Sequence, residues 1–181
     1  GDETYILAEA LASAVLTDKY DVVGSFKGSE LYGMEYKPLF DFVQPDKKAY
    51  YVVCDDFVTL TDGAGIVHTA PAFGEDDAKV GKANDLPFVQ LVNEQGNFVE
   101  AVTPWKGMFV KDADPLIIKD MESRGLVYKL LEYEHSYPYC WRCDTPLLYY
   151  ANDTWFIKMT AIKDKLLENN SKINWLPENI K

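Results

Sequence analysis

The chain has 181 residues, 48% hydrophobic and 26% charged, which is typical of a globular protein with a buried core. Its 18 Lys and Arg against 29 Asp and Glu give a net charge of −11, which argues against a surface that holds nucleic acid by its own cations alone. There is no signal-peptide pattern and no apolar run near the ~18 residues of a membrane span. With an odd number of cysteines, three, we expect a cytoplasmic protein in a reducing compartment, without a membrane partner.

Short runs of β-branched and aromatic residues, separated by Gly, Asp, Asn or Pro, predict strands along most of the chain. They cover residues 4–7, 21–26, 50–54, 57–60, 66–69, 88–92, 97–99 and 126–131. A hairpin is expected at residues 92–98, where Gly96 supplies a positive φ.

Helices are predicted at residues 8–16, 75–84 and 115–123. The last has Asp112 and Asp114 ahead of Pro115 near its start, and Gly125 as a left-handed stop. Because strands outnumber helices and do not alternate with them regularly, the pattern predicts an α+β, β-rich fold. We expect a barrel or bent sheet with peripheral helices.

The composition changes after Leu131, where aromatic residues become dense and a polar helical tail follows at residues 161–169. This change predicts one domain over residues 1–131 and a second segment over residues 132–181. The tail has no clear cap or core of its own, which indicates a piece of a longer protein.

The stretch GAGIVHTAPAFGEDD, residues 63–77, holds one of the two histidines of the chain. Its glycines predict a tight turn into a short strand that ends at His68, and Gly74 then leads into a helix whose first turn contains Asp77. Free N–H groups at a helix start favour an ionised carboxylate, which can bind an ammonium group, while His68 could face the same space and orient water or an ester.

A purely structural interpretation of this stretch also stays open. Acids in a first helical turn usually stabilise the helix by up to ~1 kcal/mol, and a histidine at a strand end is most often structural. A phosphate loop is excluded, since the stretch lacks the Lys-Ser/Thr that would bind phosphates.

The same stretch, with DDFVTLTD before it and LPFVQLVNEQGNF and HSYPYCWRCDTPLLYYANDTWFIKMT after it, resembles the editing domain inserted into isoleucyl-tRNA synthetases, which are class I aminoacyl-tRNA synthetases. The related valyl and leucyl enzymes carry other residues where this chain has His68-Thr69. The resemblance implies a barrel-like editing domain that hydrolyses mischarged valyl-tRNA(Ile) after transfer. Proofreading is needed because one missing methylene is worth only ~1–3 kcal/mol in an apolar pocket.

The resemblance also implies the roles of the site residues. Asp77 anchors the α-ammonium group of the wrong aminoacyl ester, and His68 helps to form the pocket that admits valine and excludes isoleucine. These two residues are the predicted catalytic positions. The predicted substrate-binding residues are His68, Thr69, Asp77, Gly65 and Phe73.

What lies outside the chain follows from the same resemblance. The parent enzyme charges tRNA with isoleucine, using ATP and magnesium in a catalytic domain that is absent here. The predicted partners are the acceptor end of tRNA(Ile) carrying valine and that catalytic domain, and the protein is expected to be a monomer. A threonine-rich peptide of the family, T-T-x-P-W-T, is also absent, and Thr103-Pro104-Trp105 is no substitute, so weak or no hydrolysis is expected from this chain alone.

Cys140 and Cys143 have the two-residue gap that lets two thiolates reach one zinc at ~2.3 Å, but a structural zinc needs four ligands. His135 and Cys54 are the other candidates, although Cys54 is expected to pack in a strand as a small apolar residue. We therefore predict a vacant half-site and no cofactor in this chain; a redox role is the weaker alternative. In several members of the resembled family, a second Cys-x-x-Cys outside this segment completes a zinc site.

The aromatic residues that follow residue 136 predict an interface with the catalytic domain rather than a surface on which bases stack. Two functional alternatives stay open. One is a valyl-type editing domain that clears threonine, against which His68-Thr69 argues. The other is a non-catalytic zinc-ribbon module, in which Cys140 and Cys143 matter and Asp77 is a helix-start acid only.

Overall fold

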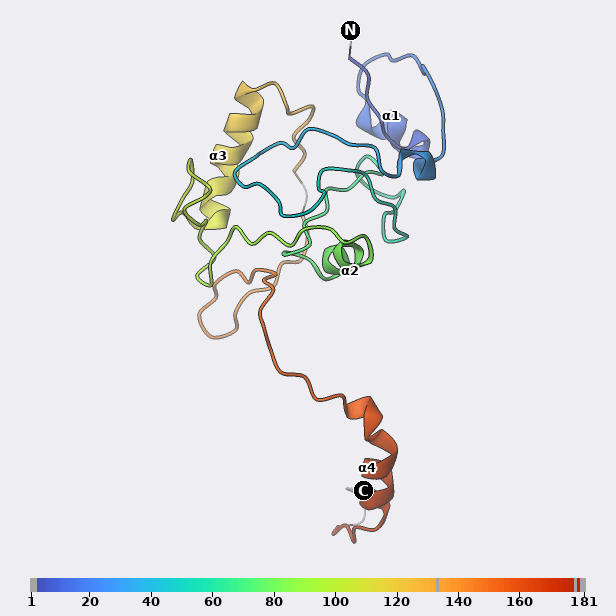
Figure 1. The fold of residues 1–181 in the computed structure, drawn as a ribbon, viewed down its shortest axis with the longest axis vertical. Helices are drawn as coiled ribbons and strands as arrows, with labels where there is room; N and C mark the ends of the chain where they lie inside the picture. The colour runs from blue at the N-terminus through green and yellow to red at the C-terminus, as the bar shows by residue number, and fades with distance from the viewer. Residues whose placement is uncertain (1–2, 133, 178, 180–181) are drawn as a thin grey trace. The chain divides into compact units, whose positions relative to one another are not determined.

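The computed structural model describes residues 3–132, 134–177 and 179 (Figure 1). The chain divides into two compact units, of which the first ends at Ala151 and the second begins at Asn152. The boundary that we predicted after residue 131 rests on a change of amino-acid composition, and it stays a prediction. Within the described ranges, none of the helices combines the length and apolar character needed to cross a membrane.

The first unit contains three α-helices among its described residues (Figure 1). They are α1 (Ala12–Val15), which continues a 3₁₀ turn at Glu9–Leu11, α2 (Glu75–Ala83) and α3 (Val110–Ser123). A further 3₁₀ turn covers Gly28–Leu31. In the second unit, a 3₁₀ turn at Met159–Ala161 precedes α4 (Lys163–Ser171). The helices predicted at residues 75–84 and 115–123 are therefore confirmed, with α3 beginning earlier than expected.

Helix α3 begins at Val110, five residues before Pro115, because the hydrogen bonds of its first turn involve only residues that precede the proline. The carbonyl of Phe109 accepts hydrogen bonds from the N–H groups of Asp112 (3.0 Å) and Ala113 (3.2 Å). At the other end, the N–H of Gly125 donates to Glu122 O and that of Leu126 to Met121 O, both at 2.9 Å. Gly125 has φ +66, so the predicted left-handed stop is confirmed as a Schellman motif.

The prediction of a β-rich, barrel-like α+β domain is wrong. Strand pairing among the described residues is limited to isolated antiparallel bridges: Glu35–Tyr51, Val92–Phe98, Asn97–Phe109 and Tyr139–Pro146. The β-type run at residues 21–26 lacks the half-buried sheet surface that such residues fit, because all six residues are exposed. Val22 is 76% exposed and Val23, its neighbour on the opposite side of an extended chain, is 82% exposed. With neither side buried, nothing holds that run against a neighbouring strand.

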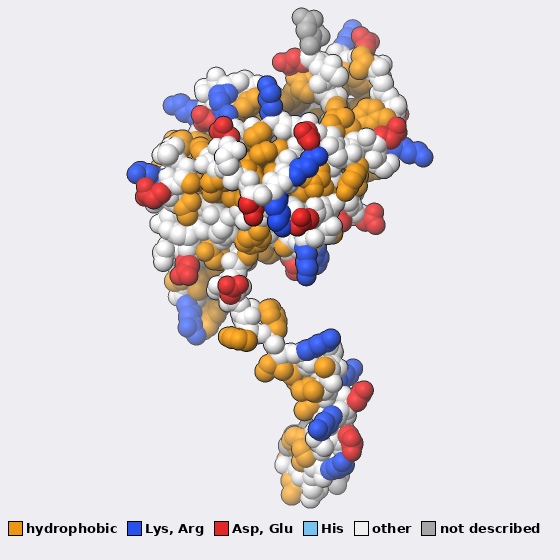
Figure 2. All heavy atoms as spheres, in the orientation of Figure 1, with side chains coloured by type: hydrophobic (Ala, Val, Ile, Leu, Met, Phe, Trp, Pro, Cys, Tyr) orange, Lys and Arg blue, Asp and Glu red, His pale blue; other side chains and the backbone are white. Residues whose placement is uncertain are grey.

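The core of the first unit is built around Trp105. Its ring meets the rings of Phe40 (centroids 5.6 Å apart) and Phe42 (5.9 Å) edge to face. Val102, and Ala113 from α3, complete the buried centre. Many other hydrophobic side chains reach the surface of both units, as Figure 2 shows.

The predicted hairpin at residues 92–98 is confirmed as a tight turn. Val92 and Phe98 form a bridge, and the N–H of Asn93 donates to Asn97 O at 2.9 Å. Gly96 has φ +79, and a Cβ there would come within 2.7 Å of the Phe109 ring, so only glycine fits both the turn and its neighbour.

Candidate functional site

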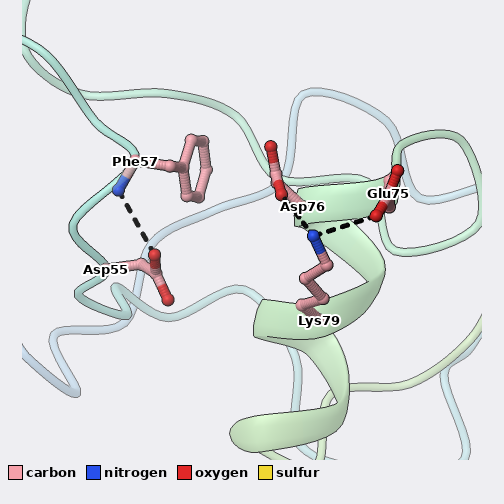
Figure 3. A network of polar contacts seen from close by, with 5 residues as sticks. All are labelled: Asp55, Phe57, Glu75, Asp76 and Lys79. Atoms are coloured by element: carbon pink, nitrogen blue, oxygen red, sulfur yellow. Dashed lines mark hydrogen bonds and ion pairs between the residues drawn. The ribbon is translucent and has the colours of Figure 1, made fainter. Parts of the chain in front are cut away.

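The first turn of α2 carries three consecutive acids, and two of them share one partner. The ammonium of Lys79 lies 3.0 Å from a carboxylate oxygen of Glu75 and 3.0 Å from one of Asp76 (Figure 3). All three side chains are exposed, and the hydrogen bonds to Asp76 and Glu75 raise the pKa of Lys79. Glu75 and Asp76 therefore act as ordinary helix-surface partners of a lysine one turn later.

The same view includes the loop at Asp55, whose carboxylate accepts a hydrogen bond from the N–H of Phe57 at 3.3 Å (Figure 3). This bond stays within that loop and does not involve α2. The two exposed acids at the start of α2 are paired with Lys79 instead.

Asp77, the third acid, is arranged differently. Its side chain is half-buried, and its Oδ1 accepts a hydrogen bond from the backbone N–H of Ala70 at 2.9 Å. Among the described residues, Oδ2 has no hydrogen-bond partner. The carboxylate also lies in the first turn of a nine-residue helix, beside the free N–H groups of the helix start.

The loop that Asp77 contacts is itself closed and attached to the helix. The N–H of Phe73 donates to the carbonyl of Ala70 at 2.9 Å, which closes a turn around the buried Ala72. Pro71 packs on Gly81 of α2, where an added Cβ would lie 2.8 Å from the proline Cβ. The loop between Thr69 and α2 is therefore held by both the carboxylate and this apolar contact.

The Gly-Ala-Gly turn at the start of the stretch is confirmed. Gly63 (φ +68) and Gly65 (φ +72) both adopt the left-handed conformation. The carbonyl of Ala64 accepts a hydrogen bond from the N–H of Ala8 at 2.8 Å, and a Cβ on Gly65 would lie 2.5 Å from the Cβ of Ala8. Gly65 thus makes room for the N-terminal segment; its binding of substrate stays a prediction.

The remaining predicted site residues lie along the same loop. His68 is exposed, and within the described part of the chain no hydrogen bond joins its ring to Asp77 or to another residue. Thr69 and Phe73 are half-buried on either side of Ala70. The structure therefore brings Asp77 to the backbone next to Thr69, while the roles of His68, Thr69 and Phe73 stay predictions.

The sequence placed Gly74 only as the entry to the helix and did not indicate its contact with Asp77. Gly74 is the N-cap of α2, and an ideal Cβ placed on it would overlap with Oδ2 of Asp77 and lie 3.0 Å from Cγ. The signal in the sequence was the spacing: a glycine three residues before the acid that the helix start favours.

Cys140 and Cys143 lie on a tight turn. The N–H of Asp144 donates to Cys140 O (2.8 Å) and the N–H of Cys140 to Thr145 O (2.9 Å). The hydroxyl of Thr145 lies 3.1 Å from Sγ of Cys143. This hydrogen bond, with the backbone of Thr145 and the Cys140 side chain, lowers the pKa of Cys143 and so favours the thiolate that binds metals.

The pair fits half of a zinc site. Two thiols on one turn can reach a single ion, but no group of three or more His, Cys, Asp or Glu is placed to hold a metal within the described residues. Cys54, which was expected to be packed in a strand, is exposed, and its Sγ lies 3.8 Å from the carbonyl of Gly28. Two further ligands would have to come from elsewhere.

A hollow of about 610 Å³ lies in the second unit, along α4 and beside Ile173 and Trp175. Leucines of α4 line it, with Lys163 as its one charged residue. It contains none of the residues that the sequence singled out, and its lining offers no acid or base pair for hydrolysis.

No protein-family model matches the chain. Curated proteins do match it along its whole length. It is 62% identical over 179 residues to the isoleucine–tRNA ligase of Clostridium novyi, and 60% identical over 179 residues to that of Clostridium acetobutylicum. The isoleucine–tRNA ligase of Thermobifida fusca is 48% identical over 182 residues. The chain is therefore similar to one segment of these isoleucine–tRNA ligases.

These matches cover 99–100% of the chain but only 17% of each ligase. They confirm the isoleucyl-tRNA synthetase resemblance at the level of the family.

Proposed function

We propose that this chain carries the editing site of an isoleucine–tRNA ligase, where valyl-tRNA(Ile) is hydrolysed to valine and free tRNA. Asp77 binds the α-ammonium group of the misplaced valine. His68 and Thr69 contribute to the pocket beside it, with Gly65 and Phe73 along the same loop.

The observation that carries this proposal is the difference between Asp77 and its neighbours. Glu75 and Asp76 share Lys79 on the exposed helix face, whereas Asp77 is half-buried and turned to the loop. The N–H of Ala70 holds Oδ1, and among the described residues Oδ2 accepts no bond. A fixed carboxylate with one oxygen available is suited to an ammonium group, since charge-assisted hydrogen bonds are the stronger ones.

The hydrolysis requires little more of this segment than that it position the ester and a water molecule. A water oxygen adds to the ester carbonyl carbon, the bond from that carbon to the tRNA ribose oxygen breaks, and the ribose oxygen leaves with a proton. The aminoacyl ester is already activated, so holding its ammonium end beside a water supplies most of the advantage. His68, exposed at the end of the loop, orients this water or the ester rather than acting as a base.

The rest of the ligase has other tasks in this proposal. It activates isoleucine with ATP and magnesium in the cytoplasm, charges tRNA(Ile), and presents the acceptor end to the segment described here. Cys140 and Cys143 would hold a zinc together with two ligands from outside this segment, and the metal would fix the fold there without entering the hydrolysis.

Two neighbouring acids allow a matched test in the whole ligase that contains this segment. Asp77→Asn removes the ammonium receptor, while Asp76→Asn removes an equal charge from the same helical turn. We expect Asp77→Asn to slow hydrolysis of valyl-tRNA(Ile) about 10- to 100-fold, the equivalent of one hydrogen bond to a charged group. Charging with isoleucine should be retained, and Asp76→Asn should edit normally.

Unchanged hydrolysis in Asp77→Asn would refute the proposal. It would leave the non-catalytic module with its cysteine pair as the better account. Equal losses in both variants would also refute it, because the effect would then come from the general charge of the helix start.

A further inference from the structure

We propose that Gly74 is a positioning residue for Asp77: the missing side chain at Gly74 leaves the space that the Asp77 carboxylate occupies while it accepts the N–H of Ala70. This inference rests on the proposed function for its effect on editing. Its structural part can be tested independently of that function.

The close approach is the first step of the argument. An ideal Cβ on Gly74 would overlap with Oδ2 of Asp77, and would lie 3.0 Å from Cγ and 3.4 Å from the Cβ of the same side chain. The carboxylate therefore lies directly over the Gly74 backbone. A larger residue at position 74 and the observed Asp77 conformation exclude one another.

The backbone does not explain the glycine. Gly74 has φ −156 and ψ 147, an extended conformation that any residue adopts without strain. Helix capping does not single out glycine, because Asn, Asp and Ser rank above it at an N-cap and would add a side-chain hydrogen bond. The position of the Asp77 carboxylate is the contact that requires a glycine here.

Other glycines of the chain differ in this respect. A Cβ at Gly24 or at Gly28 would meet nothing within 4 Å. At Gly81 it would meet Pro71, an apolar ring with no part in ammonium binding. Among these positions, Gly74 alone faces a charged group.

The consequence of adding a methyl group follows from the short Asp77 side chain. Asp has only a few staggered conformations about its first side-chain bond. Displacement from the space over Gly74 would turn the carboxylate to another of them and break its bond with the Ala70 N–H. Gly74→Ala should thus misdirect the carboxylate while keeping its charge.

The experiment compares four variants of the whole ligase: Gly74→Ala, Asp77→Ala, the double variant and Gly24→Ala as the matched control. Two substrates are used, valyl-tRNA(Ile) and the same ester with a hydroxyl in place of the α-ammonium group. Charging with isoleucine reports that each variant is folded. Exchange of the backbone amides of residues 69, 70, 72 and 73 is followed by mass spectrometry.

We expect Gly74→Ala to slow hydrolysis of the valyl ester about tenfold, the effect of a weakened rather than deleted charge-assisted bond. The hydroxy ester should be hydrolysed at the original rate, because it has no ammonium group. The double variant, in which no clash remains, should match Asp77→Ala. Gly24→Ala should behave as the unaltered ligase.

Amide exchange separates the two proposals. Gly74→Ala should expose the amides of residues 69, 70, 72 and 73 when Asp77 is present, and should add nothing to Asp77→Ala. Unchanged exchange and hydrolysis in Gly74→Ala, or a further loss on the Asp77→Ala background, would overturn the positioning role. If Asp77→Ala edits normally, the proposed function fails, and the exchange result alone then decides whether Gly74 positions Asp77.

Discussion

Pro71 lies against the backbone of Gly81, so close that a Cβ on Gly81 would come within 2.8 Å of the proline Cβ and 2.9 Å of its Cγ. Gly81 is buried in α2. It lies seven residues after Gly74, the N-cap of this helix. Together with the hydrogen bond from Ala70 to Asp77, this contact attaches the loop to α2 at two points.

Gly81→Ala should therefore destabilise the chain. Alanine is favoured over glycine inside a helix by about 1 kcal/mol, but crowding against Pro71 should cost more, about 1–3 kcal/mol. Urea unfolding measures the difference. Gly24→Ala, which meets nothing within 4 Å, is the control and should stay within about 0.5 kcal/mol. A more stable Gly81→Ala variant would show that the loop does not rest on α2.

The chain offers a matched pair of tryptophans to test the core. Trp105 is 7% exposed and meets Phe40 and Phe42 edge to face, whereas Trp155 is 99% exposed. Trp105→Ala should lower the free energy of unfolding by about 3–5 kcal/mol. Trp155→Ala should change it by less than about 0.5 kcal/mol. Equal effects of the two substitutions would contradict this assignment of the core.

The ion pair between Lys48 and Glu35, 2.8 Å apart, predicts a dependence of stability on pH. The hydrogen bond and charge of Lys48 lower the pKa of Glu35 below its usual 4.5. The unfolded chain then binds this proton more readily than the folded one. The contribution of the pair is therefore present above pH 4.5 and is lost as the pH falls through the lower folded pKa.

Glu35→Gln should remove this dependence. Its deficit in unfolding free energy should be small near neutral pH, because both side chains are exposed, and should shrink as acid is added. Urea unfolding at a series of pH values between about 3 and 7 measures it. A deficit that stays constant across that range would mean that the carboxylate is not stabilised by Lys48.

The half-site proposed for Cys140 and Cys143 leads to a prediction about zinc in the whole ligase. Cys143→Ser should remove zinc from it, because one of two adjacent thiolate ligands is lost, while Cys54→Ser should keep the metal. Metal analysis after dialysis gives the zinc content of each variant. Zinc retained in Cys143→Ser, or lost in Cys54→Ser, would contradict the half-site.

Several elements could be predicted from the sequence because their causes are local. Gly125 ends α3 and Gly96 closes the hairpin through positive φ values and hydrogen bonds within a few residues. The acids at residues 75–77 similarly marked the start of α2. In each case, the residues that determine the conformation are next to it in the chain.

The strands were predicted wrongly because strand pairing depends on distant partners. Val22 and Val23 have strong β-propensity, yet neither is buried against a neighbouring segment. The start of α3 was missed for a similar reason: Ala113 is buried with Trp105, and this packing favours a turn ahead of Pro115.

The candidate site falls between these cases. The sequence indicated that Asp77 lies in a first helical turn, which the structure shows. It did not indicate that Asp77 alone among three acids would turn to the Ala70 N–H, because Glu75 and Asp76 have the same propensities and differ only in their direction around the helix. Because Asp77 points this way, its carboxylate lies over the backbone of Gly74.

The most direct measurement of the central claim is a crystal structure of the whole ligase with a non-hydrolysable valyl-adenosine mimic. We predict that the ammonium nitrogen lies about 3 Å from Oδ2 of Asp77, with Oδ1 still accepting the N–H of Ala70. An amino group bound elsewhere, with the space beside Asp77 empty of valine, would contradict the account.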